Sequence, residues 1–327
     1  MFNENAKLSE KVFADNIPQA PTRDGFGKGS VEAGEADARV VVLCADLKES
    51  TRAEQFEKRF PERFIEMGVA EQNMATVAAG MANAGKIPFI TSYAAFSPGR
   101  NYEQIRTTIA LNNVPVKICG MHAGVSVGPD GATHQMLEDI GMMRMLPGMT
   151  VIVPADAEEA RKAVVAAAKT DGPLYIRFGR VATPVFTTTE TPFEIGKALT
   201  LWSSESPKVA ILATGSLSYT ALISAKNLSE KGIETTILHV PTIKPLDTEA
   251  ILSVAKRTGR VITIEEHQSA GGFGSAIAEF LAQNFPVQMR ILGVEDKFGQ
   301  SGTPEELLAH YGLDAKHIEE AVRKLLN

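Results

Sequence analysis

The chain has 327 residues, of which 44 % are hydrophobic and 22 % charged, and its formal net charge is −6. This length predicts about two domains, and the balance of apolar and charged residues is that of a globular protein. The mild negative charge argues against nucleic acid as a partner, because nucleic-acid binders usually carry a basic face. No apolar run reaches the roughly 18 residues that a membrane helix needs.

The first 20 residues are polar and mixed in charge, and they are expected to form a short arm or a helix before the first domain. They lack the basic start and apolar stretch of a signal peptide. The two cysteines, Cys44 and Cys119, both lie in apolar runs that predict strands. Two buried thiols make no disulfide framework, so we expect a reducing cytoplasm.

Short apolar runs alternate with helix-like stretches between residues 21 and 182. The runs are rich in β-branched residues, which is typical of strands buried on both faces. Strands that alternate with helices predict a mostly parallel sheet flanked by helices. We expect strands at 39–44, 64–66, 87–91, 115–119, 150–153 and 174–178, and helices at 71–84 and 156–169, the second capped by Asp156.

Residues 183–192 interrupt the alternation with Pro184, three consecutive threonines and Pro192, and they are expected to be a linker. The α/β pattern then resumes in a smaller unit, residues 193–327. There we expect strands at 209–213, 235–239, 260–264 and 288–292, and helices near 218–231, 247–257, 274–284, 304–310 and 314–326.

Glu71 is the first residue that could carry chemistry. It is expected in the first turn of a helix, just past the carboxyl end of the 64–66 strand, and ligands of open α/β sheets bind at that edge. A carboxylate there also complements the helix dipole without any ligand. The next stretch, which contains Tyr93 and Phe96, follows a strand, so this pair could stack on a flat ligand or belong to the core.

The stretch from Met121 to Gln135 contains two of the six histidines, His122 and His134, together with Asp130 and three glycines. Glycines allow unusual backbone angles and close approach to a ligand, and loops at strand ends commonly carry function. These features favour a ligand-handling loop. Two histidines without a third nearby ligand are weak evidence for a metal site, and we expect no metal ligands here.

Arg177 and Arg180 follow a strand, where arginines suit a phosphate or a carboxylate, although a solvated surface explains them equally well. Arg23 lies in a glycine-rich stretch and is compatible with an ordinary loop arginine. The glycines of Ser269–Ser275 are better explained by entry into a helix than by dinucleotide binding. Glu265, Glu266 and His267 form a polar cluster in the second unit to which we assign no catalytic role.

In their order and spacing these stretches resemble the transketolase family of thiamine-diphosphate enzymes. The resemblance is to the C-terminal half of a full-length transketolase, and it extends from about Pro21 to the last residue. It implies a pyrimidine-binding domain (21–182) and a smaller transketolase C-terminal domain (193–327). The motifs that carry it are the early Arg23, the turn from Ala45 to Ser50, the helix-start Glu71, the aromatic pair Tyr93 and Phe96, the Gly128–His134 loop and Arg180.

The resemblance implies that Glu71 contacts a ring nitrogen of the cofactor's aminopyrimidine and favours its imino tautomer. The exocyclic nitrogen can then take the proton from the thiazolium carbon. Tyr93, where phenylalanine is usual in the family, and Phe96 pack around the aminopyrimidine. Asp46 is implied near the cofactor pocket. His134, the second implied catalytic residue, contacts substrate hydroxyls near the reacting carbon.

The substrate side is implied by the same resemblance. Asp130 and His134 bind the substrate from one loop, and the sugar-phosphate end is held by Arg23, Ser50, His122 and Arg180. The implied reaction transfers a two-carbon ketol unit from a ketose phosphate to an aldose phosphate, as in the pentose phosphate pathway.

The family binds the diphosphate and Mg²⁺ through a Gly-Asp-Gly motif followed by an asparagine motif, and this sequence contains no such pair. The resemblance therefore implies one subunit of a split transketolase. A separate N-terminal subunit would carry the diphosphate site and the Mg²⁺ ligands, and the natural assembly is a heterotetramer built around a homodimer of this chain.

Three alternatives remain open. The chain could be the matching half of a deoxyxylulose-phosphate synthase or a 2-oxoacid dehydrogenase beta subunit. The Gly128–His134 loop disfavours the dehydrogenase, and His122 together with Ser50 favours transketolase over the synthase. A non-catalytic regulatory relative would be expected to lose its site residues, whereas those named above are intact.

Overall fold

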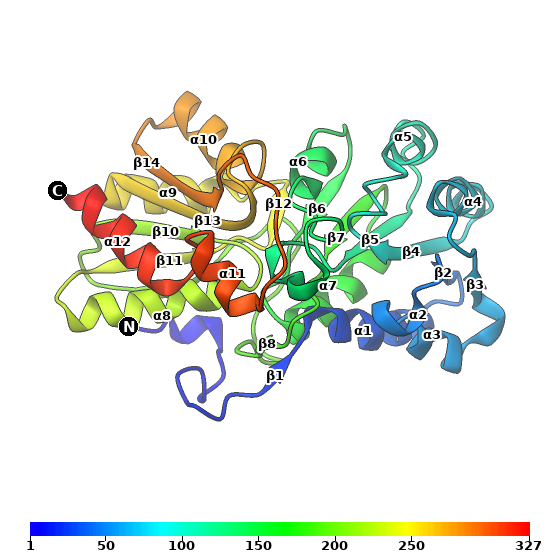
Figure 1. Cartoon of the computed structure of the whole chain (residues 1–327), viewed down its shortest axis with the longest axis horizontal. Helices are drawn as coiled ribbons and strands as arrows, with labels where there is room; N and C mark the ends of the chain where they lie inside the picture. The colour runs from blue at the N-terminus through cyan, green and yellow to red at the C-terminus, as the bar shows by residue number, and fades with distance from the viewer.

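The computed structural model describes all 327 residues. Two α/β units lie side by side, the first coloured blue to green and the second yellow-green to red (Figure 1). The predicted α/β fold, a mostly parallel sheet followed by a smaller α/β unit, is confirmed.

The first unit is built on a seven-stranded sheet of order β12-β6-β7-β5-β4-β2-β3. All neighbouring strands are parallel except β12, which pairs antiparallel with β6 and comes from the second unit's part of the chain. The expected strands are confirmed with shifts of a few residues at their ends. Their bounds are β2 Val40–Cys44, β3 Phe64–Glu66, β4 Ile87–Tyr93, β5 Lys117–Met121, β6 Thr150–Ile152, β7 Leu174–Arg177 and β12 Thr242–Lys244.

Helices cover both faces of this sheet. In Figure 1, α1 and α7 lie below it and α4, α5 and α6 above it. Asp156 caps α7 as predicted, because its carboxylate accepts the backbone N–H groups of Glu158 and Glu159. The helical segments are α1 Thr22–Ala36, α2 Lys48–Thr51, α3 Glu54–Arg59, η2 Pro61–Arg63, α4 Glu71–Asn83, α5 Tyr102–Gln104, the π-helical turn η3 Ile105–Ala110, η4 Val125–Asp130, α6 Asp139–Arg144 and α7 Ala157–Ala168.

Helix α1 differs from the expectation of a loop around Arg23. Its glycines allow a close helix crossing rather than ending the helix. A Cβ at Gly25 would collide with the backbone carbonyl of Ala157, and one at Gly29 would come within 2.8 Å of the Cβ of Val164. The glycines therefore let α1 lie directly on α7, and this contact fixes the position of Arg23.

The second unit is a five-stranded sheet of order β14-β13-β10-β11-β9, parallel except for the edge strand β9. The four expected strands and five expected helices are present, and β9 is additional. The bounds are β9 Leu199–Ser203, β10 Val209–Ala213, α8 Leu217–Glu230, β11 Thr235–His239, α9 Thr248–Thr258, β13 Arg260–Gln268, α10 Phe273–Asn284, β14 Gln288–Val294, α11 Pro304–His310 and α12 Ala315–Leu326.

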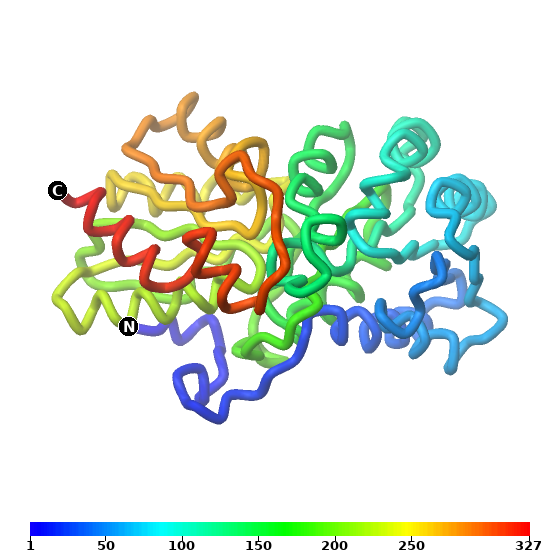
Figure 2. The backbone as a smooth tube through the Cα atoms, in the orientation of Figure 1, coloured from blue at the N-terminus to red at the C-terminus, as the bar shows by residue number.

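The N-terminal arm contains one 3₁₀ turn, η1 Glu4–Ala6, and lies against the second unit before the chain enters α1 (Figure 2). Its Asn3 backbone N–H donates to the Leu201 carbonyl. Further along, β1 Gln19–Ala20 pairs with β8 Thr183–Pro184, so the arm and the segment between the units are held together.

One apolar cluster of 34 buried residues crosses from the first sheet into the second. It joins Leu43 and Ile118 of the first unit to Leu212 and Val261 of the second. Because the two units share this core and the strand β12, the second unit is fixed against the carboxyl edge loops of the first. No helix combines the length and the apolar composition needed to cross a bilayer.

Candidate active site

The ten predicted site residues lie on the first unit, around the carboxyl ends of its parallel strands and the starts of two helices. Ligands of open α/β sheets bind at this edge. They are Arg23 at the start of α1, Asp46 after β2, Ser50 in α2, Glu71 at the start of α4, Tyr93 at the end of β4, Phe96 in the next turn, His122 after β5, Asp130 and His134 in the following loop, and Arg180 after β7.

Four aromatic rings form the centre of this group. The rings of Tyr93 and His122 stack with centroids 3.9 Å apart, and Tyr93 stacks on Phe96 at 5.7 Å. His134 meets both Tyr93 and Phe96 edge-on, at 6.0 and 5.4 Å. The structure thus joins the predicted aromatic pair to both predicted histidines, and it gives one continuous ring surface.

Arg23 contacts one edge of this ring surface and places a positive charge there. Its Nη1 donates to the Ser50 carbonyl at 2.9 Å and lies 3.2 Å from Nε2 of His122. Because a guanidinium only donates, Nε2 must be the acceptor and the ring proton of neutral His122 must sit on Nδ1. Nδ1 of His122 and Nε of Arg23 are both buried without a partner, so each remains free to donate.

His122 is almost fully buried, and its backbone lies in the left-handed region at φ 54°. Burial, followed by the positive charges of Arg23 and Arg180, lowers the pKa of His122 to about 3. The imidazole is therefore neutral at physiological pH. A strained backbone at a strand end is a common feature of functional positions.

The lowered pKa of His122 predicts a specific acid sensitivity. Between the unfolded pKa near 6.5 and the folded pKa of about 3, the unfolded chain binds the extra proton. Stability that is present above pH 6.5 is therefore lost as the pH falls, by at most about 1.4 kcal/mol per pH unit. Urea unfolding between pH 6.5 and 4 should show a shallower loss for His122→Gln than for wild type. His310→Gln, at an exposed histidine, should keep the wild-type slope; equal slopes in all three proteins would contradict the assignment.

Arg180 connects the loop after β5 to the same basic end. Its Nη1 donates to the Val127 carbonyl at 2.8 Å and lies 3.4 Å from a carboxylate oxygen of Asp130. Both side chains are about one-third exposed, so this ion pair contributes little to stability. The guanidinium of Arg180 can therefore exchange Asp130 for an anionic ligand at small cost.

Glu71 begins α4 as predicted and is only 4 % exposed. Arg100 donates to its carboxylate at 3.1 Å, and the same guanidinium lies 3.9 Å above the centre of the Phe96 ring. Asn101 donates from Nδ2 to the Glu71 backbone carbonyl and to Ser97 Oγ. A buried carboxylate thus lies at the Phe96 edge of the ring surface.

Arg100 and Asn101 were missed from the sequence. Their signal is position: they follow the aromatic stretch after a glycine turn, and a buried carboxylate needs a cationic or polar partner. The Asp46 side chain contacts none of the other predicted residues, Ser50 meets Arg23 through its backbone carbonyl, and the Glu71 carboxylate pairs with Arg100, outside the predicted set. Asp46 is exposed, with φ 59°, and its backbone N–H donates to the Glu66 carboxylate at 2.8 Å.

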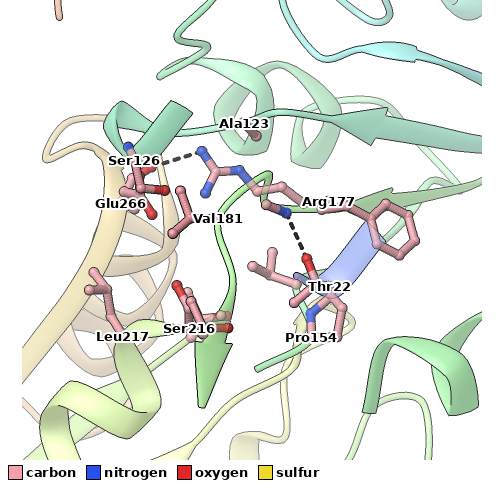
Figure 3. Close-up of a pocket in the computed structure, with 15 residues that line it drawn as sticks. Thr22, Ala123, Ser126, Pro154, Arg177, Val181, Ser216, Leu217 and Glu266 are labelled. Atoms are coloured by element: carbon pink, nitrogen blue, oxygen red, sulfur yellow. Dashed lines mark hydrogen bonds between the residues drawn. The ribbon is translucent and has the colours of Figure 1, made fainter. Parts of the chain in front are cut away.

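A small cavity of about 30 Å³ lies between the two units and is lined by none of the ten predicted site residues (Figure 3). It is lined by Thr22 and Arg177 of the first unit and by Ser216 and Glu266 of the second. Arg177 is buried and donates to Asp139 at 2.7 Å and to the Glu266 backbone carbonyl at 2.8 Å. This cavity is therefore a polar seam between the units, distinct from the ring surface.

No group of three or more His, Cys, Asp or Glu side chains is arranged to hold a metal ion. The polar groups that the site offers are one buried carboxylate, which accepts hydrogen bonds, two imidazoles, and a set of guanidinium groups, which donate them. Such groups suit an organic ligand with a protonatable ring and an anionic end.

The fold and this site agree with two family models. Residues 19–185 match the pyrimidine-binding domain of transketolase, and residues 196–318 match the transketolase C-terminal domain. The chain therefore belongs to the transketolase family.

Individual relatives with high sequence identity support the assignment to this family. A transketolase C-terminal section from Methanocaldococcus jannaschii is 43 % identical over 92 % of this chain and 96 % of its own length. A 6-deoxy-6-sulfo-D-fructose transketolase subunit from Clostridium sp. is 40 % identical, with 93 % and 94 % covered. A solved structure described as a split-gene transketolase, an inactive beta4 tetramer, superposes with a TM-score of 0.87 at 43 % identity, covering 94 % of this chain and 98 % of that one.

Proposed function

We propose that the protein is the pyrimidine-binding subunit of a split transketolase and transfers a two-carbon ketol unit between sugar phosphates when joined to a second subunit. The observation that carries this proposal is the buried carboxylate of Glu71 beside the Tyr93–Phe96 ring surface. A carboxylate that must share a proton with a weakly basic ring nitrogen needs such an enclosed position.

The residues present fit the aminopyrimidine end of thiamine diphosphate, the cofactor that the family uses. Tyr93 and Phe96 offer flat apolar surface for the ring, and Glu71 offers the proton-sharing oxygen. When bound, the cofactor supplies a nucleophilic thiazolium carbon that stabilises negative charge on the transferred unit. Arg100 holds the Glu71 carboxylate in a fixed orientation, and Asp46 is proposed to border the cofactor pocket.

We propose that the substrate phosphate binds beside the two arginines of the site. Arg23 and Arg180 are guanidinium donors, His122 offers its free Nδ1–H, and Ser50 lies beside Arg23. Donors of this kind match a phosphate dianion. Asp130 and His134, on the loop that Arg180 touches, are proposed to bind the sugar hydroxyls near the reacting carbon.

Arg23→Met and Arg180→Met are each expected to raise KM for a phosphorylated sugar about tenfold in the assembled enzyme, because each removes a charge-assisted contact to the phosphate. The KM for the matching unphosphorylated sugar should stay within about twofold, since that sugar makes no phosphate contact. Steady-state kinetics with both sugars test this, with Arg106→Met at an exposed arginine as the control. A parallel rise of KM for both sugars would place the phosphate elsewhere.

We place the diphosphate site and its Mg²⁺ on a separate polypeptide. The support is that the two relatives described above, a C-terminal section and a subunit, are matched over nearly their full length. We further propose two copies of each chain in a heterotetramer. The free, buried cysteines Cys44 and Cys119 suit a reducing cytoplasm.

Calorimetric titration of thiamine diphosphate and Mg²⁺ tests this division. We expect no tight binding to this chain alone and tight binding to a mixture with the subunit that carries the Gly-Asp-Gly and asparagine motifs. Tight, Mg²⁺-dependent binding to the purified chain by itself would contradict the proposal. One relative is named for a sulfonated fructose, so that sugar is a second donor to assay with the mixture.

A further inference from the structure

The loop that carries Asp130 and His134 is closed at its base. The backbone N–H of Gly124 donates to the Met136 carbonyl at 2.9 Å, and Arg177 donates to the same carbonyl from the next strand. Its tip, however, has no regular strand pairing, so other contacts must hold Asp130 and His134 in place.

Arg180 of the first unit contacts the loop at Val127 and Asp130, and the remaining contacts come from the second unit. The Glu266 carboxylate, on β13, accepts the backbone N–H of Ser126 at 2.5 Å. Gly124 has φ 90°, and a Cβ there would collide with the same carboxylate. Glu266 is thus enclosed by the first turn of the loop and is only 7 % exposed.

A second contact comes from the segment before α11. Gln135, next to His134, donates from Nε2 to the Gln300 carbonyl at 2.9 Å and to the Val125 carbonyl at 3.0 Å. Gly131 lies against Ser301, where a Cβ would come within 2.7 Å of the hydroxyl oxygen. The second unit therefore touches the loop at both of its ends.

We infer that Glu266 is a positioning residue, through which the C-terminal unit holds the 124–135 loop in the conformation that presents Asp130 and His134 to the sugar. The inference rests on the proposed function for its kinetic consequence. Removing the Glu266 carboxylate would leave the buried backbone N–H of Ser126 without a hydrogen-bond partner, which costs more than the net worth of an ordinary hydrogen bond.

The neighbouring Glu265 provides a matched control. It is also buried, but its carboxylate accepts the N–H groups of Phe273 and Gly274 at 2.6 and 2.7 Å and so caps α10 within the second unit. Substitutions at Glu265 therefore disturb the fold of the second unit without touching the loop.

The kinetic test uses the enzyme assembled with its second subunit. Glu266→Ala should raise KM for the sugar phosphate about tenfold while kcat changes less than about threefold, and Glu266→Gln, whose amide oxygen can still accept, should recover most of the wild-type KM. Glu265→Ala should lower the melting temperature and leave KM unchanged. An unchanged KM in Glu266→Ala, or the same KM rise in Glu265→Ala, would overturn the inference.

Hydrogen–deuterium exchange on this chain alone separates the inference from the proposed function. Peptides that cover 124–135 should exchange at least about tenfold faster in Glu266→Ala than in wild type or Glu265→Ala. If no ketol transfer is found with wild type, the proposed function fails while this result still supports the positioning role. Unchanged exchange in Glu266→Ala would overturn it whatever the activity.

Discussion

Replacing Glu71 by glutamine is expected to lower ketol transfer by the assembled enzyme about a hundredfold or more, the range for loss of a positioned proton-transfer group. Glutamine keeps the size of the side chain, and its amide oxygen can still accept from Arg100. It cannot share a proton with a ring nitrogen. The loss should therefore appear in kcat with little change in the melting temperature.

Glu103→Gln is the matched control for this variant, because Glu103 is an exposed carboxylate on the segment just after Arg100. Its activity should stay within about twofold of wild type, as for most surface substitutions. If Glu71→Gln retained comparable activity, the cofactor role proposed for Glu71 would be wrong.

Arg177→Leu is expected to lower the free energy of unfolding by about 3–5 kcal/mol, because it leaves the buried Asp139 without its charge partner. Asp139 is completely buried, and Arg177 donates to its carboxylate at 2.7 Å while also reaching the Met136 carbonyl within the first unit and the Glu266 carbonyl of the second unit. Urea unfolding followed by circular dichroism measures the loss, in this chain alone.

Arg39→Leu is the control for this prediction. Arg39 also pairs with an aspartate at 2.7 Å, but its side chain is 64 % exposed, so the stability should hardly change. The difference between the two losses in free energy of unfolding measures how much burial adds to the cost of breaking an ion pair. A similar, small loss in both proteins would contradict the view that Arg177 joins the two units.

The strands were largely predictable from the sequence for one physical reason, whereas the roles of the site residues came from the family resemblance. In a parallel sheet the strands are apolar on both faces, so their ends are marked by the first polar residues. Glu71 and Arg180 both follow such ends, and the resemblance to the transketolase family implied that they serve one site. The structure puts both at one edge of the sheet and adds the stacking of His122 on Tyr93.

Helix α1 could not be predicted from the local sequence. Four glycines within Thr22–Ala36 suggest loop structure, because glycine costs about 1 kcal/mol in a helix interior. Contact with α7 outweighs that cost, since only glycine allows the two backbones to approach so closely at Gly25 and Gly29. Local propensity gives way here to tertiary packing.

The electrostatics of the site also needed the three-dimensional structure. The pKa of His122 depends on burial and on Arg23, which lies 99 residues earlier in the chain. The pairing of Glu71 with Arg100 depends on how the turn after β4 folds back. The short edge strands β9 and β12 are set by pairing partners rather than by their own sequence.

We propose that this chain supplies half of a transketolase active site. Ketol transfer from xylulose 5-phosphate to ribose 5-phosphate, with thiamine diphosphate and Mg²⁺, tests this proposal most directly when this chain, the second subunit and their mixture are assayed separately. We expect activity only in the mixture, rising to a maximum at equal amounts of the two chains. Activity in the highly purified chain alone would contradict it.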